Sequence, residues 1–260
     1  MLFANHLILI RGGGDIATGV AYRLHKAGFP IVVLELERPL VIRRTVAVAT
    51  AVLQGSAHIE DLHAQLVHSP AEAIQLAQTG MIPVLVAPQL NTAPFILHNS
   101  QFTIVDARLA KRNIDTAIDQ ASLVIALGPG FMAGVDCHAV IETMRGHTLG
   151  RVIWDGPALP NTGTPGIIGG KGKERVLRAP CEGIVAWRLA IGDLVNEGDL
   201  IGQVAGRPVL APFDGVIRGL IARGTAVPLN LKIGDVDARQ DVARPVSPSQ
   251  TKRLPLVAAS

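Results

Sequence analysis

The N-terminal part of the chain alternates between continuous apolar runs and segments whose apolar residues recur every three or four positions. Residues 7–10 form an apolar run that predicts a strand, and a glycine-rich turn follows at 11–14. Residues 15–27 have the apolar spacing of a helix, and residues 31–36 form a second apolar run. A strand, a turn, a helix and a strand within about 30 residues predict a βαβ unit with parallel strands.

The same alternation continues to residue 155. A capping box at Ser69–Glu72 predicts the start of a helix that ends near residue 78, and another helix is expected at 136–144. Strands that alternate with helices predict an α/β fold, a Rossmann-like doubly wound parallel sheet over residues 1–155. Its remaining strands are expected at 81–86, 102–105, 123–127 and 152–154.

The composition changes after residue 155. Residues 156–175 are rich in glycine and proline and are interpreted as a linker. Residues 176–240 contain an internal repeat, in which Ala179–Gly183 recurs as Ala211–Gly215. The short strands and glycine turns of each copy predict a small all-β barrel-sandwich, and residues 241–260 are left as a C-terminal tail.

The repeat resembles the half-motif of lipoyl and biotinyl domains. In those domains the modified lysine sits at the hairpin between the two halves, whereas residues 205–208 of this chain contain no lysine. Covalent attachment of biotin or lipoate is therefore not expected. Packing against the first domain, contact with a partner and oligomerisation stay open as roles of the barrel.

The composition narrows the class of protein. Apolar residues make up 48% of the chain and charged residues 17%, which excludes a disordered chain. No apolar run reaches the roughly 18 residues that cross a membrane, and the first apolar run lacks the basic segment of a signal peptide. Cys137 and Cys181 lie in different predicted domains, so we expect a reducing, cytoplasmic location. The net charge of +3, without basic runs interleaved with aromatic residues, disfavours nucleic acid.

A glycine fingerprint follows the first predicted strand. Gly12, Gly13, Gly14 and Ala17 match a dinucleotide-binding turn, because a strand precedes them and a helix begins there. The free amides at such a helix end favour phosphate. Glu35, near the end of the second strand, is expected to accept hydrogen bonds from ribose hydroxyls. The alternative is a tight turn without a ligand.

Three charged residues near this turn have more than one interpretation. Asp15 repels phosphate unless it caps the helix or binds a metal–nucleotide or a sugar, and capping is the simpler interpretation. Arg43 and Arg44 follow the second strand. They either hold a second anion, such as the 2′-phosphate of an adenosine, or are exposed to solvent.

The ends of two later strands carry further candidate residues. Asp106 and Lys111 follow one strand, and Gly128 and Gly130 follow the next. Because ligands of open α/β sheets bind at the carboxyl ends of the strands, these residues are expected to face the glycine turn. An internal salt bridge explains Asp106 equally well.

An acid, a cation and an imidazole lie close together at Glu142, Arg145 and His147. Glu142 and Arg145 are three residues apart on a predicted helix, where a local ion pair is the simpler explanation. His147, together with Asp106, is the candidate acid–base residue if the chain is catalytic.

No metal site is expected. His58, His63 and His68 recur every five residues, which spreads them around a helix instead of placing them on one face. The sequence also lacks the HExxH and CxxC metal motifs, the GxSxG motif of hydrolases and the Walker motif of NTPases.

Several ordered motifs of the chain match those of a known family. They are Arg11–Ala17, Ala110–Asn113, Leu127–Phe131, Val140–His147 and, in the barrel, Lys232–Arg239. With these motifs the sequence resembles the YqeB family of the selenium-dependent molybdenum hydroxylase system. Its Rossmann-like part is also similar to that of XdhC-type accessory proteins. Ala238 departs from the family's usual proline, and the tail beyond it looks looser than the family's ending, so both departures fall at the edge of the barrel.

The resemblance implies a process and not a reaction. It suggests an accessory or maturation protein whose partner is a molybdenum hydroxylase or one of its maturation proteins. Together with the glycine turn, it predicts a nucleotide-bearing ligand, either NAD(P) or a dinucleotide form of the molybdenum cofactor. An NAD(P)-dependent oxidoreductase and an interaction scaffold with a vestigial nucleotide cleft stay open as alternatives. A membrane partner is not expected, and a homo-oligomer stays open.

Overall fold

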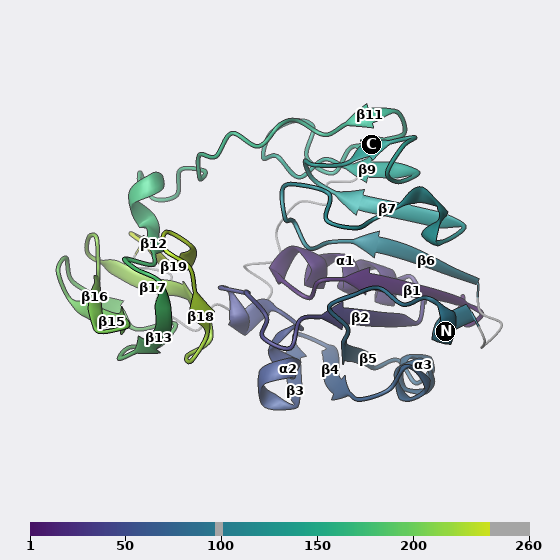
Figure 1. The fold of residues 1–260 in the computed structure, drawn as a ribbon, viewed down its shortest axis with the longest axis horizontal. Coiled ribbons are helices and arrows are strands. Elements are labelled where there is room, and N and C mark those ends of the chain that lie inside the picture. Colours follow the sequence, from purple (N-terminus) through teal and green to yellow (C-terminus); the bar gives the residue numbers. More distant parts are fainter. Residues whose placement is uncertain (97–100, 240–260) are drawn as a thin grey trace. The chain divides into compact units, whose positions relative to one another are not determined.

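The computed structural model describes residues 1–96 and 101–239, which divide into two compact units (Figure 1). The described part of the first unit comprises Met1–Pro39 and residues 46–162, and that of the second comprises Leu40–Thr45 and residues 163–239. The predicted tail at 241–260 lies outside the described residues.

The first unit contains, in its described residues, a nine-stranded sheet with the order β10-β9-β7-β6-β1-β2-β5-β4-β3. Its inner strands pair in parallel, whereas β10 pairs with β9 and β3 with β4 in antiparallel fashion. The sheet is therefore mixed. Its strands are β1 (His6–Arg11), β2 (Ile31–Glu35), β3 (Ser56–Ile59), β4 (Leu62–Val67), β5 (Ile82–Val86), β6 (Gln101–Asp106), β7 (Leu123–Leu127), β9 (Ala139–Ile141) and β10 (Val152–Ile153). A separate antiparallel pair consists of β8 (Met132–Ala133) and β11 (Gly156–Pro157).

Each face of this sheet carries its own core, because successive side chains of a strand point to opposite faces. Leu7 and Leu9 of β1 belong to the core of the first face, and Ile8 and Ile10 to the core of the second face. Helices α3 (Pro70–Gln78) and α4 (Ala93–Ile96) contribute to the first core. Helices α1 (Asp15–Lys26) and α2 (Thr50–Gln54) contribute to the second core. A short 3-10 turn, η1 (Arg44–Val46), precedes α2, and η2 (Ile118–Gln120) precedes β7.

The predicted helix at 136–144 is wrong. This segment contains β9, in which Val140 packs into the first core and Ile141 packs against the second. Two neighbouring residues that face opposite cores follow the period of a strand, and a short apolar run does not distinguish a buried strand from a helix.

The predicted fold class, a Rossmann-like doubly wound sheet followed by a lipoyl-like barrel-sandwich, is also wrong. Both edges of the observed sheet are antiparallel. The described connection from β6 to β7 contains only the 3-10 turn η2, and the one from β7 to β9 contains β8, so neither supplies the crossover helix of a doubly wound sheet.

The second unit contains, within the residues described, two four-stranded antiparallel sheets around one shared core. It is not confined to residues 176–240, because Leu40–Thr45 packs in it as well. One sheet has the order β12-β19-β17-β14 and the other β16-β15-β13-β18. Their bounds are β12 (Val176–Arg178), β13 (Gly183–Trp187), β14 (Leu194–Val195), β15 (Leu200–Val204), β16 (Arg207–Leu210), β17 (Gly215–Leu220), β18 (Ala226–Val227) and β19 (Lys232–Asp237), preceded by η3 (Lys173–Arg175).

The segment Leu40–Thr45 is joined to the second unit by its backbone. The N–H of Leu220 donates to the carbonyl oxygen of Ile42 at 3.0 Å. Gly219 allows this approach, since a Cβ there would lie 2.6 Å from the Ile42 side chain. None of the helices in the described residues is long and apolar enough to cross a membrane.

Candidate functional site

The glycine turn joins β1 directly to α1 and is packed against the chain itself. A Cβ at Gly12 would lie 3.0 Å from Cα of Arg108, and one at Gly13 would lie 2.9 Å from the backbone nitrogen of Ala49. Gly12 also has a φ of +89°, in the left-handed region that favours glycine. Internal packing therefore explains both glycines without a ligand.

Glu35 holds this turn in place. Its buried carboxylate accepts the N–H of Gly13 at 2.9 Å and the N–H of Leu36 at 2.5 Å. Burial raises the pKa of Glu35, and the two backbone hydrogen bonds oppose part of that shift. The sequence predicted that Glu35 holds a ribose. In the structure its carboxylate orders the glycine turn.

The N-terminus of α1 is capped by Gly14, whose extended backbone has φ −66° and ψ −179°. Gly14 has no side chain that could cap this end, where the positive end of the helix dipole lies. Asp15 lies in the first turn and not at the cap position. Ala17 packs into the second core, and Thr18 donates to the carbonyl oxygen of Gly14 at 2.8 Å.

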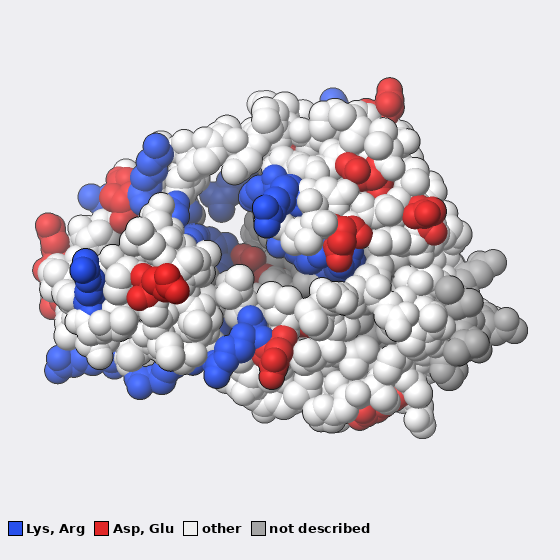
Figure 2. All heavy atoms as spheres, in the orientation of Figure 1, with Lys and Arg blue, Asp and Glu red and all other residues white. Residues whose placement is uncertain are grey.

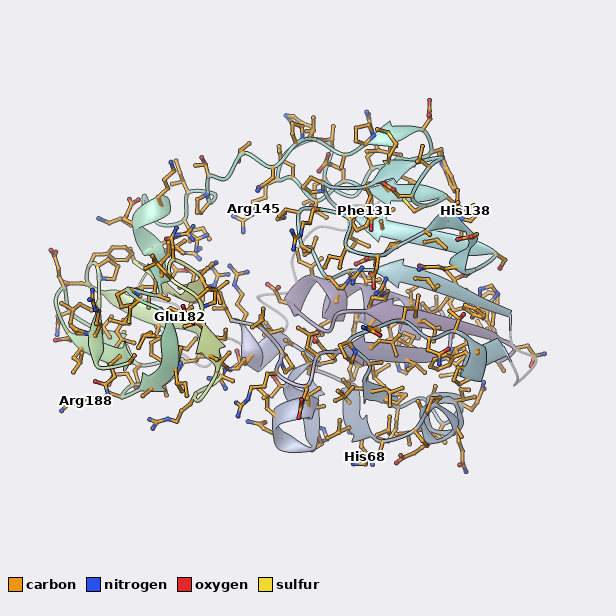
Figure 3. The ribbon with its side chains drawn as sticks, viewed as in Figure 1. His68, Phe131, His138, Arg145, Glu182 and Arg188 are labelled. Atoms are coloured by element: carbon orange, nitrogen blue, oxygen red, sulfur yellow. The ribbon has the colours of Figure 1, made fainter. Side chains whose placement is uncertain are left out.

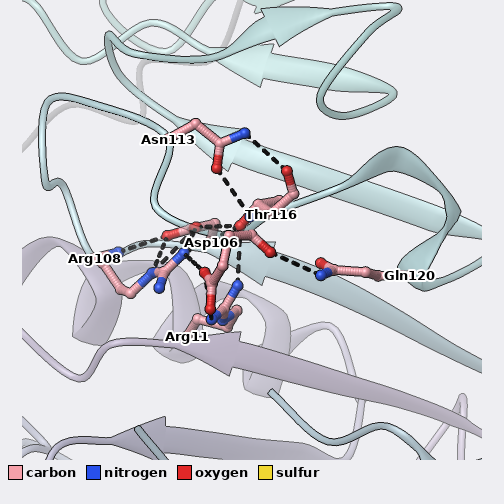
Figure 4. A network of polar contacts seen from close by, with 7 residues as sticks. Arg11, Asp106, Arg108, Asn113, Thr116 and Gln120 are labelled. Atoms are coloured by element: carbon pink, nitrogen blue, oxygen red, sulfur yellow. Dashed lines mark hydrogen bonds and ion pairs between the residues drawn. The ribbon is translucent and has the colours of Figure 1, made fainter. Parts of the chain in front are cut away.

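Asp106 is the centre of a buried polar network beside the turn (Figure 4). It ends β6 opposite Arg11 of β1. The guanidinium of Arg108 donates to both of its carboxylate oxygens, and the hydroxyl of Thr116 donates at 2.6 Å. The structure thus shows the internal ion pair that was the alternative for Asp106, and its carboxylate has no exposure for proton transfer from a ligand.

The same network folds the loop after β6 over the strand ends. Arg11 donates to Thr116 at 3.0 Å and to Asp115 at 2.8 Å. Burial alone would raise the pKa of Asp115, but hydrogen bonds from Arg11 and Arg108 outweigh it and the pKa lies below its ordinary value. Asn113 brackets Thr116 by accepting its N–H and donating to its carbonyl oxygen. Sequence reasoning missed Arg11, although its place just before the glycines was a signal.

The turn after β7 packs against this loop. A Cβ at Gly130 would lie 2.4 Å from Cα of Arg112, and one at Gly128 would lie 2.6 Å from Oγ1 of Thr143. Lys111 is exposed and has a φ of +64°. The structure therefore brings Gly130 and the Lys111 segment together through mutual packing. Phe131, the next residue, is buried in the first core (Figure 3).

His147 and Arg145 lie on an exposed turn after β9. Glu142 does not form the expected helical pair with Arg145, because its buried carboxylate accepts the N–H of Met144 at 2.6 Å and that of Leu159 at 2.8 Å. The helix on which that pair was predicted is absent from the described segment 136–144.

Arg43 and Arg44 pack within the second unit. Arg43 forms an ion pair with the buried Asp235, with an N–O distance of 3.5 Å. The Nε of Arg44 donates to the carbonyl oxygen of Leu220 at 2.7 Å, and burial lowers the pKa of Arg44. These contacts fix Leu40–Thr45 to the second unit, a structural role that sequence reasoning did not anticipate.

Among the described residues, no group of three or more His, Cys, Asp or Glu side chains is placed to hold a metal. His58 and His63 face each other across the β3–β4 hairpin, with ring centroids 4.5 Å apart. His68 follows β4 on the surface (Figure 3). The three histidines thus belong to a hairpin and its exit and not to a helix.

Two known structures resemble the chain only weakly. An aspartoacylase family protein from Mesorhizobium loti is 11% identical, with a TM-score of 0.24 over 89% of this chain and 84% of that chain. A succinylglutamate desuccinylase/aspartoacylase from Rhodobacter sphaeroides is 13% identical, with a TM-score of 0.28 over 88% of this chain and 84% of that chain. No protein-family model matches the chain.

Comparison with curated sequences gives a strong similarity. The chain is 49% identical over 249 residues to the uncharacterized protein YqeB of Escherichia coli. The match covers 96% of this chain and 46% of YqeB, so the chain spans less than half the length of that relative. Over nearly its whole length, the chain is therefore similar to the matched part of YqeB.

Proposed function

We propose that this chain is an accessory protein in the maturation of a selenium-dependent molybdenum hydroxylase and that it binds a nucleotide-bearing ligand by its phosphates at the N-terminus of α1. The observation that carries the binding proposal is the helix end at Gly14, a residue without a capping side chain, which follows a turn held by Glu35. The maturation role rests on the resemblance of the motifs to the YqeB family.

The physical case begins with the helix end. The helix dipole favours an anion at this position, and a preordered turn loses little entropy when the anion binds. Gly13 is held from two sides, since its N–H donates to Glu35 and its carbonyl oxygen accepts the N–H of Ala49 at 2.9 Å. The backbone and Cγ of Arg108 lie beside Gly12, and the side chain of Arg108, which pairs with Asp106, remains partly exposed.

Glu35 also suits a nucleotide. Each carboxylate oxygen accepts one backbone N–H in the structure, and a carboxylate has about four acceptor positions. It therefore keeps capacity for a ribose hydroxyl in addition to its role in the turn. NAD(P) and a dinucleotide form of the molybdenum cofactor both combine phosphates with such hydroxyls, so both are candidate ligands.

The oxidoreductase alternative receives less support than binding alone. The carboxylate of Asp106 already accepts hydrogen bonds from Arg108 and Thr116, and His147 lies on an exposed turn. The proposal keeps a cytoplasmic location, because Cys137 and Cys181 are free and lie in different units.

Calorimetry and thermal unfolding test the proposal with NAD(P)(H), CTP, ATP and the dinucleotide cofactor. A ligand at 100 times its Kd adds about 2.7 kcal/mol to the stability of the folded state. Gly14→Asp places a carboxylate where the phosphate is expected and should weaken binding at least ten-fold. Gly14→Ser, which caps the same helix without charge, is the matched control and should weaken it less.

Two results would overturn the binding proposal. One is the lack of stabilisation by any of these ligands, which would favour the scaffold alternative. The other is equal affinity of the Gly14→Asp and Gly14→Ser variants for the ligand, since a phosphate at the helix end cannot be indifferent to a neighbouring carboxylate.

A further inference from the structure

Two buried carboxylates lie on the same side of β19 in the second unit. Val236 packs into the core of this unit, so its neighbours Asp235 and Asp237 point to the opposite, outer face of the sheet. Their exposed fractions are only 0% and 1%. Because a buried charge is costly unless it is paired, the side chains that cover these carboxylates decide what this face can do.

The two carboxylates are paired with more cations than they neutralise, and we call this group the β19 cation cluster. Five basic side chains form ion pairs with them: Arg43, Arg175 and Lys232 with Asp235, and Arg218 and Arg239 with Asp237. The cluster therefore carries an excess of three positive charges. In the first unit, by contrast, Asp106 and Asp115 pair with two arginines, so that network is balanced.

Acidic residues elsewhere in the second unit have other contacts. Asp193, Asp199 and Asp214 accept backbone N–H groups of turns, and Glu174 lies near Lys171. The sequence beyond residue 239 contains one acidic and three basic side chains, so it adds no net negative charge. The positive excess of the cluster is therefore available to a ligand.

Part of the cluster reaches solvent. The side chains of Arg239, Lys232 and Arg218 are 49%, 38% and 19% exposed. Arg218 donates to Asp237 through Nη1 at 3.1 Å, and since a guanidinium has five N–H donors, it keeps donors for a ligand. Burial lowers the pKa of Arg218 and the charge of Arg43 lowers it further, so the cations repel one another. Figure 2 shows Lys and Arg side chains near η3 and β12 of this unit, with acidic side chains beside them.

We propose that the β19 cation cluster binds a small anion that carries phosphate groups. An anion relieves the repulsion among partly buried cations, and arginine forms paired hydrogen bonds with phosphate oxygens. Asp235 and Asp237 are two residues apart, which is about 7 Å along a strand, so the cations that surround them span the size of one or two phosphate groups. This proposal does not depend on nucleotide binding at α1, which lies in the other unit.

Calorimetric titration of the full chain with inorganic pyrophosphate tests the proposal. The titrations are made in the Gly14→Asp background, so that α1 does not contribute a second phosphate site. Replacing both Arg239 and Lys232 by glutamine should weaken binding at least about ten-fold, because two charged donors are lost. Both buried carboxylates keep an arginine partner in this variant. The control is Arg188→Gln, which removes an exposed arginine of the same unit and should leave the affinity unchanged (Figure 3).

The outcomes separate the possible ligands. Lack of pyrophosphate binding, or equal affinity of the double variant and Arg188→Gln, would overturn the proposal. Binding to vesicles that contain phosphatidylglycerol without binding of pyrophosphate would also overturn it, in favour of a membrane surface. Thermal unfolding of each variant confirms that it is folded. Nucleotide affinity at α1, measured with Gly14 intact, should be unchanged by the double substitution, so the two proposals fail independently.

Discussion

The two units both bury carboxylates among arginines, but they use them differently. In the first unit, Asp106 lies at the end of a strand, and its partner Arg108 is only two residues away. In the second unit, Asp235 lies within β19, and its partners Arg43 and Arg175 are 192 and 60 residues away. The first arrangement orders a loop over the strand ends. The second ties distant segments of the chain to one strand.

The sequence separation of the paired residues indicates how far the loss of one ion pair should spread. A pair between near neighbours in sequence restrains a loop, and its loss is confined to that loop. An ion pair between distant segments closes a long loop of the chain, so its loss weakens the whole unit. The second unit should therefore be the more sensitive of the two to the loss of a single carboxylate.

The largest expected effect is that of Asp235→Ala. Arg175 is buried and would be left without its charge partner, a change that typically costs about 3–5 kcal/mol. Urea unfolding followed by the fluorescence of the buried Trp187 reports on the second unit, with Trp154→Phe as the background. Glu182→Ala removes an exposed carboxylate of the same unit and is the control (Figure 3). A loss below about 1 kcal/mol for Asp235→Ala would show that solvent replaces the pair.

A smaller loss is expected for Asp106→Asn, on the order of 1–3 kcal/mol. Arg108 is partly exposed and keeps a second carboxylate partner, Asp115, at 2.8 Å. Thermal unfolding measures the effect, and the exposed Asp119→Asn provides the comparison. If Asp106→Asn destabilises as strongly as Asp235→Ala, the contrast between local and long-range pairs is wrong.

Sequence patterns anticipated local structure better than long-range contacts. The helix expected at 15–27 is α1, and Ser69 caps α3 by accepting the N–H of Glu72 at 3.2 Å. These features depend on neighbouring residues, which a single sequence displays. The doubly wound sheet did not follow from them, because the edge strands are short and pair in antiparallel fashion.

The candidate site shows the same limit. The glycine turn and Asp106 were predicted at the ends of parallel strands, where β1 and β6 place them. That Glu35 binds Gly13, and that Arg43 joins the second unit, depends on packing between distant segments. A single sequence does not show which distant residues contact each other.

The pH dependence should differ in sign between two carboxylates, Glu35 of the first unit and Asp237 of the second. Burial raises the pKa of Glu35, so its stabilising contribution is present below about pH 4 and is lost as the pH rises through the folded-state pKa. Burial also acts to raise the pKa of Asp237, but hydrogen bonds from Arg239 and the charge of Arg218 outweigh it. The pKa of Asp237 is thus lowered, and its contribution is present above about pH 4 and is lost as the pH falls through that lower value.

Urea midpoints measured against pH separate these two contributions. Asp237→Asn should flatten the loss of second-unit stability below about pH 4, and Glu35→Gln should flatten the decline of first-unit stability above it. The effects should be smaller than those of Asp235→Ala, since no buried arginine loses its partner. Parallel pH profiles for Asp237→Asn and the unsubstituted protein would contradict the lowered pKa.

The smallest expected effect is on thiol reactivity. It reports on each unit separately, because each unit contains one cysteine. Cys137 of the first unit is fully buried, and burial raises its pKa to about 11, with nearby Asp136 adding to the shift. Cys181 of the second unit is only half-buried. Iodoacetamide at pH 8 should therefore label Cys181 first.

Cys137 should then react only when the first unit opens, so its labelling rate follows the free energy of that opening. Asp106→Asn should accelerate the labelling of Cys137 and leave that of Cys181 unchanged, and Asp235→Ala should do the reverse. If both variants accelerate both thiols equally, the two units unfold as one cooperative body. The buried carboxylates would then stabilise a single structure in common, and the difference in sequence separation between their partners would have no energetic consequence.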